Sequence, residues 1–377
     1  MHEPISPPRF KRRRLDVSES DTKQVPRTRQ FDLQIYSWNV NGIAPFIQPA
    51  ITSFFQSRSN SLEPEQTAQA SLRDFLRRHA WPTLLLLQEV KINPEDKATM
   101  GAVRRAVRKQ PEDDAGETDY EAHFCLPSDK YNARGFGRKV YGVCTIVRRD
   151  WADAHVEKIR PVSWDAEGRF LVIETRASGN IPKLAIINVY AVNGTENPYR
   201  DSVTGEVKGT RHDRKLQVHA LLQKECRALE ADGFKVIVAG DLNIARSRID
   251  GFPNLRTFPH QHCINRADFE VKFLAHADEP AGTEQSNRGL GMIDSFRHLH
   301  PNRKAYTFYP RTRTFGASCD RVDLILCSRT LESNLVDAGM LETPGERGPS
   351  DHVPLYASFQ LLEASKLIAN ESQHDNA

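Results

Sequence analysis

The sequence predicts an α/β fold in which strands and helices form stacked layers. Short apolar runs of strand character recur along residues 31–361 and alternate irregularly with a few amphipathic helices. The strict strand–helix alternation and the glycine-rich first turn of a doubly wound parallel sheet are both missing. There is no internal repeat and no long linker inside 31–361, so we expect one domain rather than two.

The composition limits the class of protein. The chain has 377 residues, 39% hydrophobic and 27% charged, which suffices for one large sandwich domain with tails. The longest apolar run, Trp81–Gln88, is far too short to span a bilayer, and the first thirty residues lack the apolar stretch of a signal peptide. None of the six cysteines stands in a CxxC spacing, so the sequence contains no zinc-ribbon motif. Several cysteines lie inside apolar runs, as reduced cysteines of a core do, which favours a reducing compartment. We therefore expect no membrane segment.

The positive charge is concentrated at the start of the chain. Residues 1–30 hold eight Lys or Arg and four acidic residues, which gives this segment a net charge of +4. The whole chain has a net charge of +3, so the rest of the chain, its body, carries −1. We predict a disordered basic tail at 1–30, a folded domain at 31–362 and a C-terminal tail at 363–377. The cluster Lys11–Arg14 suits nuclear import or non-specific phosphate contact, or is a solvated charge run with neither role.

The first elements are identified by their caps and their apolar spacing. Leu33–Trp38 and Thr83–Glu89 are apolar runs of strand length. Ser71–Ala80 is predicted as a helix with Ser71 as its N-cap, because its apolar residues recur three and four positions apart. Pro94–Lys109 is predicted as a second helix, whose basic last turn suits the helix dipole.

The rest of the chain is mostly strands. These runs are short and rich in β-branched residues, as strands are. The predicted elements are strands 120–126, 143–148, 170–176 and 184–192, helix 214–231, strand 235–240, helix 267–276, and strands 321–327 and 353–361. Many strands with few helices indicate a layered sandwich.

Polar residues of a similar kind stand at the ends of these strands. They are amides, carboxylates, a tyrosine and a histidine: Asn39-Val40-Asn41-Gly42, Gln88-Glu89, Tyr190 with Asn193-Gly194, Gly240-Asp241-Leu242-Asn243, Arg321-Val322-Asp323 and Ser350-Asp351-His352. Ends of adjacent buried strands converge, and such groups are costly to bury unless a cation or ligand pairs with them. Oxygen ligands without a cysteine cluster suit Mg²⁺ or Mn²⁺. The set also supplies the base and the hydrogen-bond donor that phosphodiester hydrolysis requires.

Each motif taken singly has a structural explanation. Gly240–Asn243 could be a simple turn, Glu89 a surface acid at a strand end and Tyr190 an ordinary strand residue. Asp323 could be an ion-pair partner of Arg321. The order and spacing of the whole series carry the functional signal.

Together the motifs resemble those of the exonuclease III / apurinic-apyrimidinic endonuclease branch of the endonuclease/exonuclease/phosphatase family. The resemblance covers about residues 32–361. It rests on Asn39–Gly42, Leu87–Lys91, Asn188–Tyr190, Gly240–Ala245, Arg321–Asp323 and Ser350–Pro354, and extends to Asp294–Arg297 and Tyr306–Phe308. It implies a four-layer α/β sandwich with two central mixed β-sheets flanked by helices.

The resemblance also implies roles for single residues. It implies that Asp241 aligns water, Asn243 donates to the phosphate and Asp323 orients His352. The implied catalytic residues are Tyr190, Asp241, Asn243, Asp323 and His352. The implied metal ligands are Glu89 as the principal one, Asn39, Asp241, Asn243, Asp351 and His352. The implied DNA contacts are Arg169, Asn193, Phe308 and Val322. For Arg169 the alternative is a plain hairpin turn at Gly168-Arg169.

The implied function is a Mg²⁺-dependent DNA phosphodiesterase of base excision repair, with Mn²⁺ able to substitute, acting as a monomer in the nucleus. It would cleave 5′ of abasic sites, process 3′ ends as a 3′→5′ exonuclease, or do both, on duplexes with an abasic site, a nick or a recessed 3′ end. Tyr190 favours this branch, because phosphatases, sphingomyelinases and DNase I-like members resemble one another in carrying a histidine near this position. The alternatives are a phosphomonoesterase or a phospholipid or inositol phosphodiesterase on the same fold, or an inactive nucleic-acid-binding module.

Three features depart from the family pattern. Val192 replaces a proline of many relatives, and 195–214 is a polar insert that is either a substrate-side loop or surface variation. Asp320 stands where a pocket tryptophan is expected, and repulsion between its carboxylate and phosphates predicts a weaker preference for abasic sites. The alternative is that Asp320 points outward and pairs with Arg321 or another cation, while a neighbour such as Phe315 closes the pocket.

One further cluster has metal-ligand chemistry. His260, His262 and Cys263 lie within four positions of one another. No second cluster is spaced to complete the four ligands of a zinc site, so we do not expect zinc here.

Overall fold

The computed structural model describes residues 32–47, 70–111, 113–133, 141–178, 181–275 and 289–361. These residues belong to one compact unit that begins at Phe31. The tails predicted at 1–30 and 363–377 lie outside the described residues, so the domain boundaries stay predictions. Within the described part, no helix has the length and apolar character to cross a bilayer.

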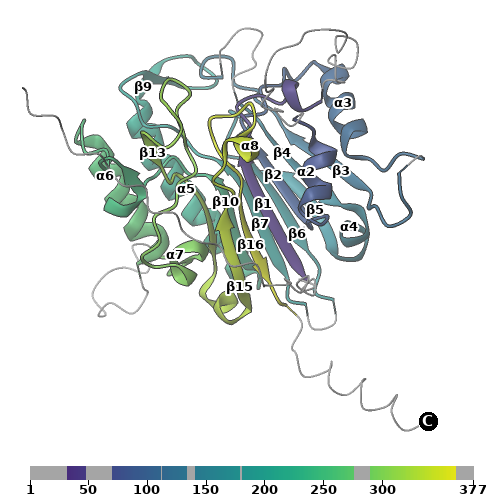
Figure 1. The fold of residues 1–377 in the computed structure, drawn as a ribbon. Helices are drawn as coiled ribbons and strands as arrows, with labels where there is room; N and C mark the ends of the chain where they lie inside the picture. The colour runs from purple at the N-terminus through teal and green to yellow at the C-terminus, as the bar shows by residue number, and fades with distance from the viewer. Residues whose placement is uncertain are drawn as a thin grey trace, which may run out of the picture. The chain divides into compact units, whose positions relative to one another are not determined.

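One mixed sheet of six strands contains the first and last strands of the described chain (Figure 1). Its strand order is β15 (Leu335–Met340), β16 (Leu355–Phe359), β1 (Leu33–Asn39), β2 (Leu84–Gln88), β4 (Val143–Arg148) and β3 (Tyr120–Cys125). β1 runs parallel to β2 and antiparallel to β16. Every residue of β2 is buried, as expected for a strand covered on both faces.

A second mixed sheet has the same number of strands. Its order is β12 (Ile293–Asp294), β14 (Asp323–Cys327), β10 (Lys235–Asp241), β7 (Leu184–Tyr190), β6 (Phe170–Thr175) and β5 (Val156–Pro161). β10 runs parallel to β7 and antiparallel to β14. Two short ribbons accompany the sheets: β8 (Pro198–Arg200) with β9 (Val207–Thr210), and β11 (Gly251–Phe252) with β13 (Cys319–Asp320).

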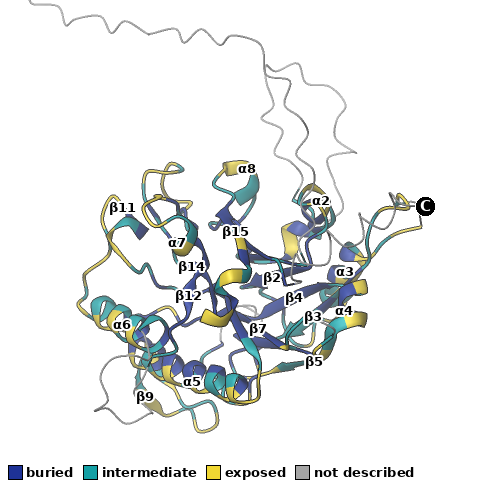
Figure 2. Cartoon of the chain, turned by 90° about the horizontal axis from the view of Figure 1, so that it is seen from below, coloured by how far each residue is buried: buried dark blue, intermediate teal, exposed yellow. Residues whose placement is uncertain are grey.

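The two sheets pack face to face between layers of helices, so the predicted four-layer sandwich is confirmed. Apolar residues of both sheets share one core, including Ile35, Leu86, Ile186 and Ile237. The outer face of the first sheet packs on α2 (Leu72–Arg78) and α3 (Lys97–Val107). The outer face of the second sheet packs on α5 (Arg211–Ala231) and α6 (Gln261–Phe269). Figure 2 shows the buried strands lying between these helices.

The remaining short helices complete the chain. α4 (Arg149–His155) contributes Trp151 and α7 (Ser295–Leu299) contributes Phe296 to the core between the sheets. α8 spans Pro344–Arg347. The 3-10 and π-helical segments are η1 (Ala44–Phe46), η3 (Arg248–Asp250), the π-helical η4 (Glu270–Leu274) and η6 (Arg329–Asn334).

Side-chain caps fix where several helices begin. Ser71 caps α2 by accepting from the Asp74 N–H, as predicted. Asp96 caps α3, so this helix starts at Lys97 rather than at the predicted Pro94. Thr210 and Asp213 form a reciprocal capping box, which starts α5 at Arg211, three residues before the predicted start.

Other boundaries differ from the prediction as well. The predicted helix 267–276 begins earlier, at Gln261, and ends in the π-helical turn η4 at Leu274. The strands predicted at 321–327 and 353–361 are shorter in the structure, where they form β14 (Asp323–Cys327) and β16 (Leu355–Phe359). The sequence reading also missed β5, β15 and α4, because short strands at the sheet edges and a helix of about two turns give weak periodicity. The insert 195–214 forms the β8–β9 ribbon and the start of α5.

The strand directions bring the polar strand ends to a single edge of the sandwich. Asn39 at the end of β1 lies opposite Gln88 at the end of β2. Tyr190 at the end of β7 lies opposite Asp241 at the end of β10, which in turn pairs with Asp323 at the start of β14. Parallel strands place their carboxyl ends together and antiparallel neighbours place their amino ends there.

Candidate active site

A cavity of about 350 Å³ lies at this shared edge. Residues from both sheets and from the connecting loops line it. They are Asn39, Glu89, Tyr190, Asn193, Asp241, Asn243, Ala245, Arg256, His262, Phe308, Asp320, Val322, Asp351 and His352. The strand-end residues that were predicted separately thus surround one space.

The turn after β10 is held in a conformation that aims two site residues at the cavity. Gly240 has a φ of +149°, and a Cβ there would lie 1.9 Å from the Val189 carbonyl oxygen, so only glycine fits. Asn243 also has a positive φ (+53°), and its N–H donates to Asp241 Oδ1 (2.9 Å). The Asn243 amide Nδ2 donates to the Ala191 carbonyl (3.0 Å). Residues held in such sparsely populated backbone regions cluster at functional sites.

Glu89 and Asp241 form an acidic wall that joins the two sheets. The Asn39 Nδ2 donates to Glu89 Oε2 (3.2 Å) and to Asp241 Oδ2 (3.0 Å). The Tyr190 hydroxyl donates to the same Glu89 oxygen (3.1 Å), and Lys91 Nζ lies 3.0 Å from Glu89 Oε1. Glu89 and Lys91 both have positive φ angles (+55° and +52°), so the chain is strained where it presents this carboxylate.

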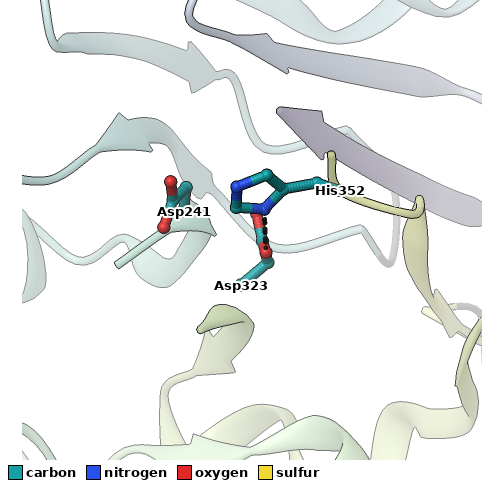
Figure 3. Close-up of side chains that lie close together, drawn as sticks. All are labelled: Asp241, Asp323 and His352. Atoms are coloured by element: carbon teal, nitrogen blue, oxygen red, sulfur yellow. Dashed lines mark hydrogen bonds and ion pairs between the residues drawn. The ribbon is translucent and has the colours of Figure 1, made fainter. Parts of the chain in front are cut away.

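His352 stands beside Asp241 and is oriented by Asp323 (Figure 3). The His352 Nδ1 is 2.7 Å from Asp323 Oδ2, and both residues are buried. Burial alone would lower the pKa of His352, but the Asp323 carboxylate raises it to about 10, with Asp241 adding to the effect. Burial and the neighbouring Asp323 raise the pKa of Asp241 to about 7. The site therefore pairs a cationic imidazole with a carboxyl that titrates near neutral pH.

The donor set fits a hard divalent cation. Glu89, Asp241 and Asp351 offer carboxylate oxygens at the cavity and Asn39 lies between two of them, a set that suits Mg²⁺ or Mn²⁺. In the described part of the chain, the ligand atoms of Asp241, Asp323 and His352 also lie within 4.8 Å of one another. His352, one of the predicted metal ligands, belongs to this group, and the division of ligands between Glu89 and His352 stays a prediction.

Of the predicted site residues, two do not line the cavity. Asp323 is buried behind His352, where it can only act through that histidine. Arg169 is 2% exposed, and its guanidinium donates to the Tyr190 and Ala191 carbonyls (3.0 and 3.3 Å). The prediction that Arg169 contacts DNA is therefore wrong. Asn193, Phe308 and Val322 do lie at the cavity, and their role as DNA contacts stays a prediction.

Arg169 instead supports Tyr190 from behind. Its guanidinium lies 3.9 Å from the ring centre of Tyr141 and 4.8 Å from that of Tyr190. The buried Glu167 pairs with Arg169 (3.1 Å) and with Arg211 at the start of α5 (2.7 Å). This buried network ties the insert and α5 to the end of β7.

Arg169→Met should therefore act on stability and leave the salt dependence of DNA binding unaltered. Breaking a buried ion pair costs about 3 kcal/mol or more of unfolding free energy. Losing a phosphate contact would instead reduce the slope of log K against log salt by about 0.9. Urea unfolding and DNA-binding titrations at several salt concentrations measure the two effects. A reduced slope with unchanged stability would restore Arg169 as a DNA contact.

Three residues of the site were not predicted to belong to it, and of these only His262 was considered, as a possible zinc ligand. Arg256 and His262 line the cavity from the loop after β11 and from α6. Lys215 of α5 is buried and donates to the Asn243 carbonyl (2.8 Å), which holds the turn after β10. No local pattern marks Arg256 or Lys215, because each reaches the site through packing of a distant segment. The possible zinc ligands His260 and Cys263 are not part of the metal-ligand group found among the described residues.

Comparison with known proteins adds relatives to this geometry. The model of the Endonuclease/Exonuclease/phosphatase family matches residues 36–352. The chain is 26% identical over 360 residues to DNA-(apurinic or apyrimidinic site) endonuclease 2 of Bos taurus, covering 90% of this chain and 62% of the relative. It is 28% identical to the Mus musculus protein of the same name, covering 86% of this chain and 60% of that one. The chain thus spans about three fifths of the length of these curated relatives.

Solved structures share the fold. The catalytic domain of Xenopus laevis APE2 superposes with a TM-score of 0.57 at 21% identity, covering 87% of this chain and 92% of that one. An AP endonuclease from Archaeoglobus fulgidus gives a TM-score of 0.55 at 19% identity, over 87% and 99% of the two chains. The 3′ phosphatase NExo from Neisseria, bound to a product DNA hairpin, gives 0.53 at 21% identity, over 87% and 99%.

Proposed function

Because this chain belongs to the endonuclease/exonuclease/phosphatase family, we propose that it is a metal-dependent DNA phosphodiesterase of base excision repair. It cleaves 5′ of abasic sites, processes 3′ ends as a 3′→5′ exonuclease, or does both. The observation that carries this proposal is the meeting of Glu89, Asp241 and His352 around one cavity, with Tyr190 bonded to Glu89. Relatives named as abasic-site endonucleases support the choice of DNA as substrate.

The residues of the cavity can divide the work of hydrolysis. Asp241 takes the proton of the attacking water, whose oxygen bonds to phosphorus while the bond from phosphorus to the leaving sugar oxygen breaks. The His352 imidazolium neutralises phosphate charge, and Asn243 contributes a hydrogen-bond donor. Tyr190 is placed to stabilise the leaving oxygen or the phosphate. Mg²⁺, or Mn²⁺ in its place, bound by Glu89 with Asn39 beside it, would supply positive charge to the same phosphate.

The proposal is tested with end-labelled duplexes that contain an abasic analogue, a nick or a recessed 3′ end. We expect cleavage in the presence of Mg²⁺ and none with EDTA. The pattern of products gives the balance between endonuclease and exonuclease. Hydrolysis of a phosphoinositide without any DNA cleavage would favour a lipid phosphodiesterase instead, and DNA binding without cleavage would favour an inactive binding module.

The partner of this site is duplex DNA, and the chain acts as a monomer in the nucleus. The body carries a net charge of −1, so DNA must be held by local basic groups such as Arg256 at the cavity. The basic tail at 1–30 supplies the nuclear address through Lys11–Arg14.

Deleting residues 1–30 should weaken nuclear accumulation and leave catalysis at low salt nearly intact. The tail carries the +4 charge and none of the strand-end motifs. Imaging of a tagged full-length and truncated chain measures the first effect, and the duplex assay measures the second. Nuclear accumulation that persists in the truncated chain would remove the import role.

A further inference from the structure

A second group of cavity residues, which forms a second wall, differs from the acidic wall in combining apolar and polar side chains. Phe308 and Val322 give it an apolar surface, and Asp320, Arg256 and His262 give it polar groups. Burial lowers the pKa of His262 to about 4, with Arg256 and His212 acting in the same direction, so its imidazole is neutral at neutral pH. This wall holds no residue of the proposed metal or proton-transfer set.

Backbone pairing on both sides holds Asp320 in place. Its N–H donates to the Phe308 carbonyl (3.1 Å), and its own carbonyl accepts from the Phe308 N–H (2.8 Å). On its other side Asp320 pairs with Gly251, where a Cβ would come within 3.0 Å of Asp320 Oδ1. The small residue at 251 therefore leaves room for the carboxylate.

The alternative in which Asp320 pairs with Arg321 is wrong. Asp320 lines the cavity, and Arg321 pairs with Asp250 and Asp294 instead (2.7 and 2.8 Å). Phe315 does not close the cavity either, because it stacks on Tyr309 with ring centres 4.1 Å apart.

The Asp320 carboxylate is a half-buried acceptor that the protein leaves open. Among the described residues, no group donates a hydrogen bond to it or forms an ion pair with it. Arg266, the nearby cation that could do so, donates instead to the Ala245 and Arg256 carbonyls (2.7 and 2.8 Å). Neither Asp320 oxygen is among the buried side-chain atoms without a partner, so the carboxylate remains accessible and can accept a hydrogen bond from a ligand.

The guanidinium groups of Arg256 and Arg266 interact electrostatically with the Asp320 carboxylate. Burial raises the pKa of its carboxyl, and Arg256 and Arg266 oppose that shift. The sequence predicts that the Asp320 carboxylate repels the phosphates of DNA. That expectation holds for a carboxylate with no cation nearby. In the folded chain Arg256 stands at the same wall, where it can meet a phosphate while Asp320 meets a neutral part of the substrate.

Phe308 connects Asp320 to the reaction centre. It forms backbone bridges to Asp320 on one side and to His352 on the other, and its ring centre lies 5.0 Å from that of His352. Two adjacent strand spacings separate the backbones of Asp320 and His352 by about 10 Å. Phe308 therefore lies between His352 and Asp320 along this wall.

We propose that Asp320 accepts a hydrogen bond from the C1′ hydroxyl of a ring-closed abasic deoxyribose, while Arg256 contacts an adjoining phosphate. This inference rests on the proposed DNA phosphodiesterase function and names how its pocket recognises the substrate. A hydroxyl occupies C1′ only when the base has been lost, so an acceptor at this position reads base loss directly. A base at the same carbon removes the donor. The pocket would thus distinguish an abasic sugar from an intact nucleotide by a hydrogen bond, whereas an aromatic wall would distinguish them by shape.

The test compares two duplexes that differ by one hydroxyl, a natural abasic site and its tetrahydrofuran analogue. A hydrogen bond to a charged group corresponds to roughly tenfold or more in kcat/KM. We expect the wild-type protein to prefer the natural site by about that factor. Asp320→Ala should abolish the preference, and Asp320→Asn, which keeps an acceptor oxygen, should retain part of it. Glu157→Ala, at an exposed carboxylate of β5, is the matched control.

A recessed 3′ end and a duplex with one ribonucleotide complete the experiment. Wild-type protein that cleaves none of the DNAs would contradict the proposed function itself. Wild-type protein that cleaves the recessed end and treats the two abasic sugars alike would overturn this inference alone. A preference that persists in Asp320→Ala, or that follows the 2′ hydroxyl of the ribonucleotide instead, would also overturn it. Should Asp320→Ala fail to fold, the wild-type ratio and the Asp320→Asn ratio decide.

Discussion

Replacing Asp241 with asparagine should lower kcat about a hundredfold or more, the scale on which an acid–base group contributes. Burial and Asp323 raise the pKa of Asp241 to about 7, so its carboxyl can exchange a proton near neutral pH. Asparagine keeps the size of the side chain and loses both the charge and this proton. The Asn39 and Asn243 donors then compete for one remaining acceptor oxygen.

His352→Ala should lower kcat on a similar scale, for a different reason. His352 carries positive charge next to the cavity because Asp323 raises its pKa to about 10. Alanine removes the charge and leaves the buried Asp323 carboxylate without its partner. Thermal unfolding of the variant separates this loss of stability from the loss of turnover.

Single-turnover kinetics and DNA-binding titrations measure both effects. Binding of DNA should persist in Asp241→Asn, because phosphate contacts away from the reacting bond supply most of the affinity. Near-normal turnover in either variant would show that the proposed division of roles is wrong.

Glu89→Ala should abolish activity at ordinary Mg²⁺ concentration and regain part of it when the metal concentration is raised. Glu89 is the carboxylate at which Asn39, Lys91 and Tyr190 converge. Removal of a carboxylate oxygen weakens the affinity of a hard cation, and we expect the half-activating concentration to rise roughly tenfold or more.

Titration of activity with Mg²⁺ and with Mn²⁺ checks this expectation. Glu95→Ala is a matched control, because Glu95 is an exposed carboxylate six residues further along the same loop. Inactivity at every metal concentration, in a variant that still unfolds cooperatively, would mean that Glu89 is not the principal metal ligand.

Local sequence patterns determined most of the framework. The Ser71 cap, the apolar run of β2 and the strand at Val143–Arg148 were all readable within a few residues, because capping and periodicity depend on near neighbours. The site was readable too where its residues terminate strands. Asn39 and Asp241 follow apolar runs directly, and strand direction then brings such ends to one edge.

Tertiary packing alone decided what lies behind and opposite these strand ends. Arg169 was expected to contact DNA, yet the rings of Tyr141 and Tyr190 and the acid Glu167 enclose it, so it supports the site from inside. Arg256 and Lys215 reach the site from a loop and a helix that carry no motif. Burial and charge environment depend on which distant segments cover a side chain. The local spacing of residues in the sequence does not show which distant segments will cover a given side chain.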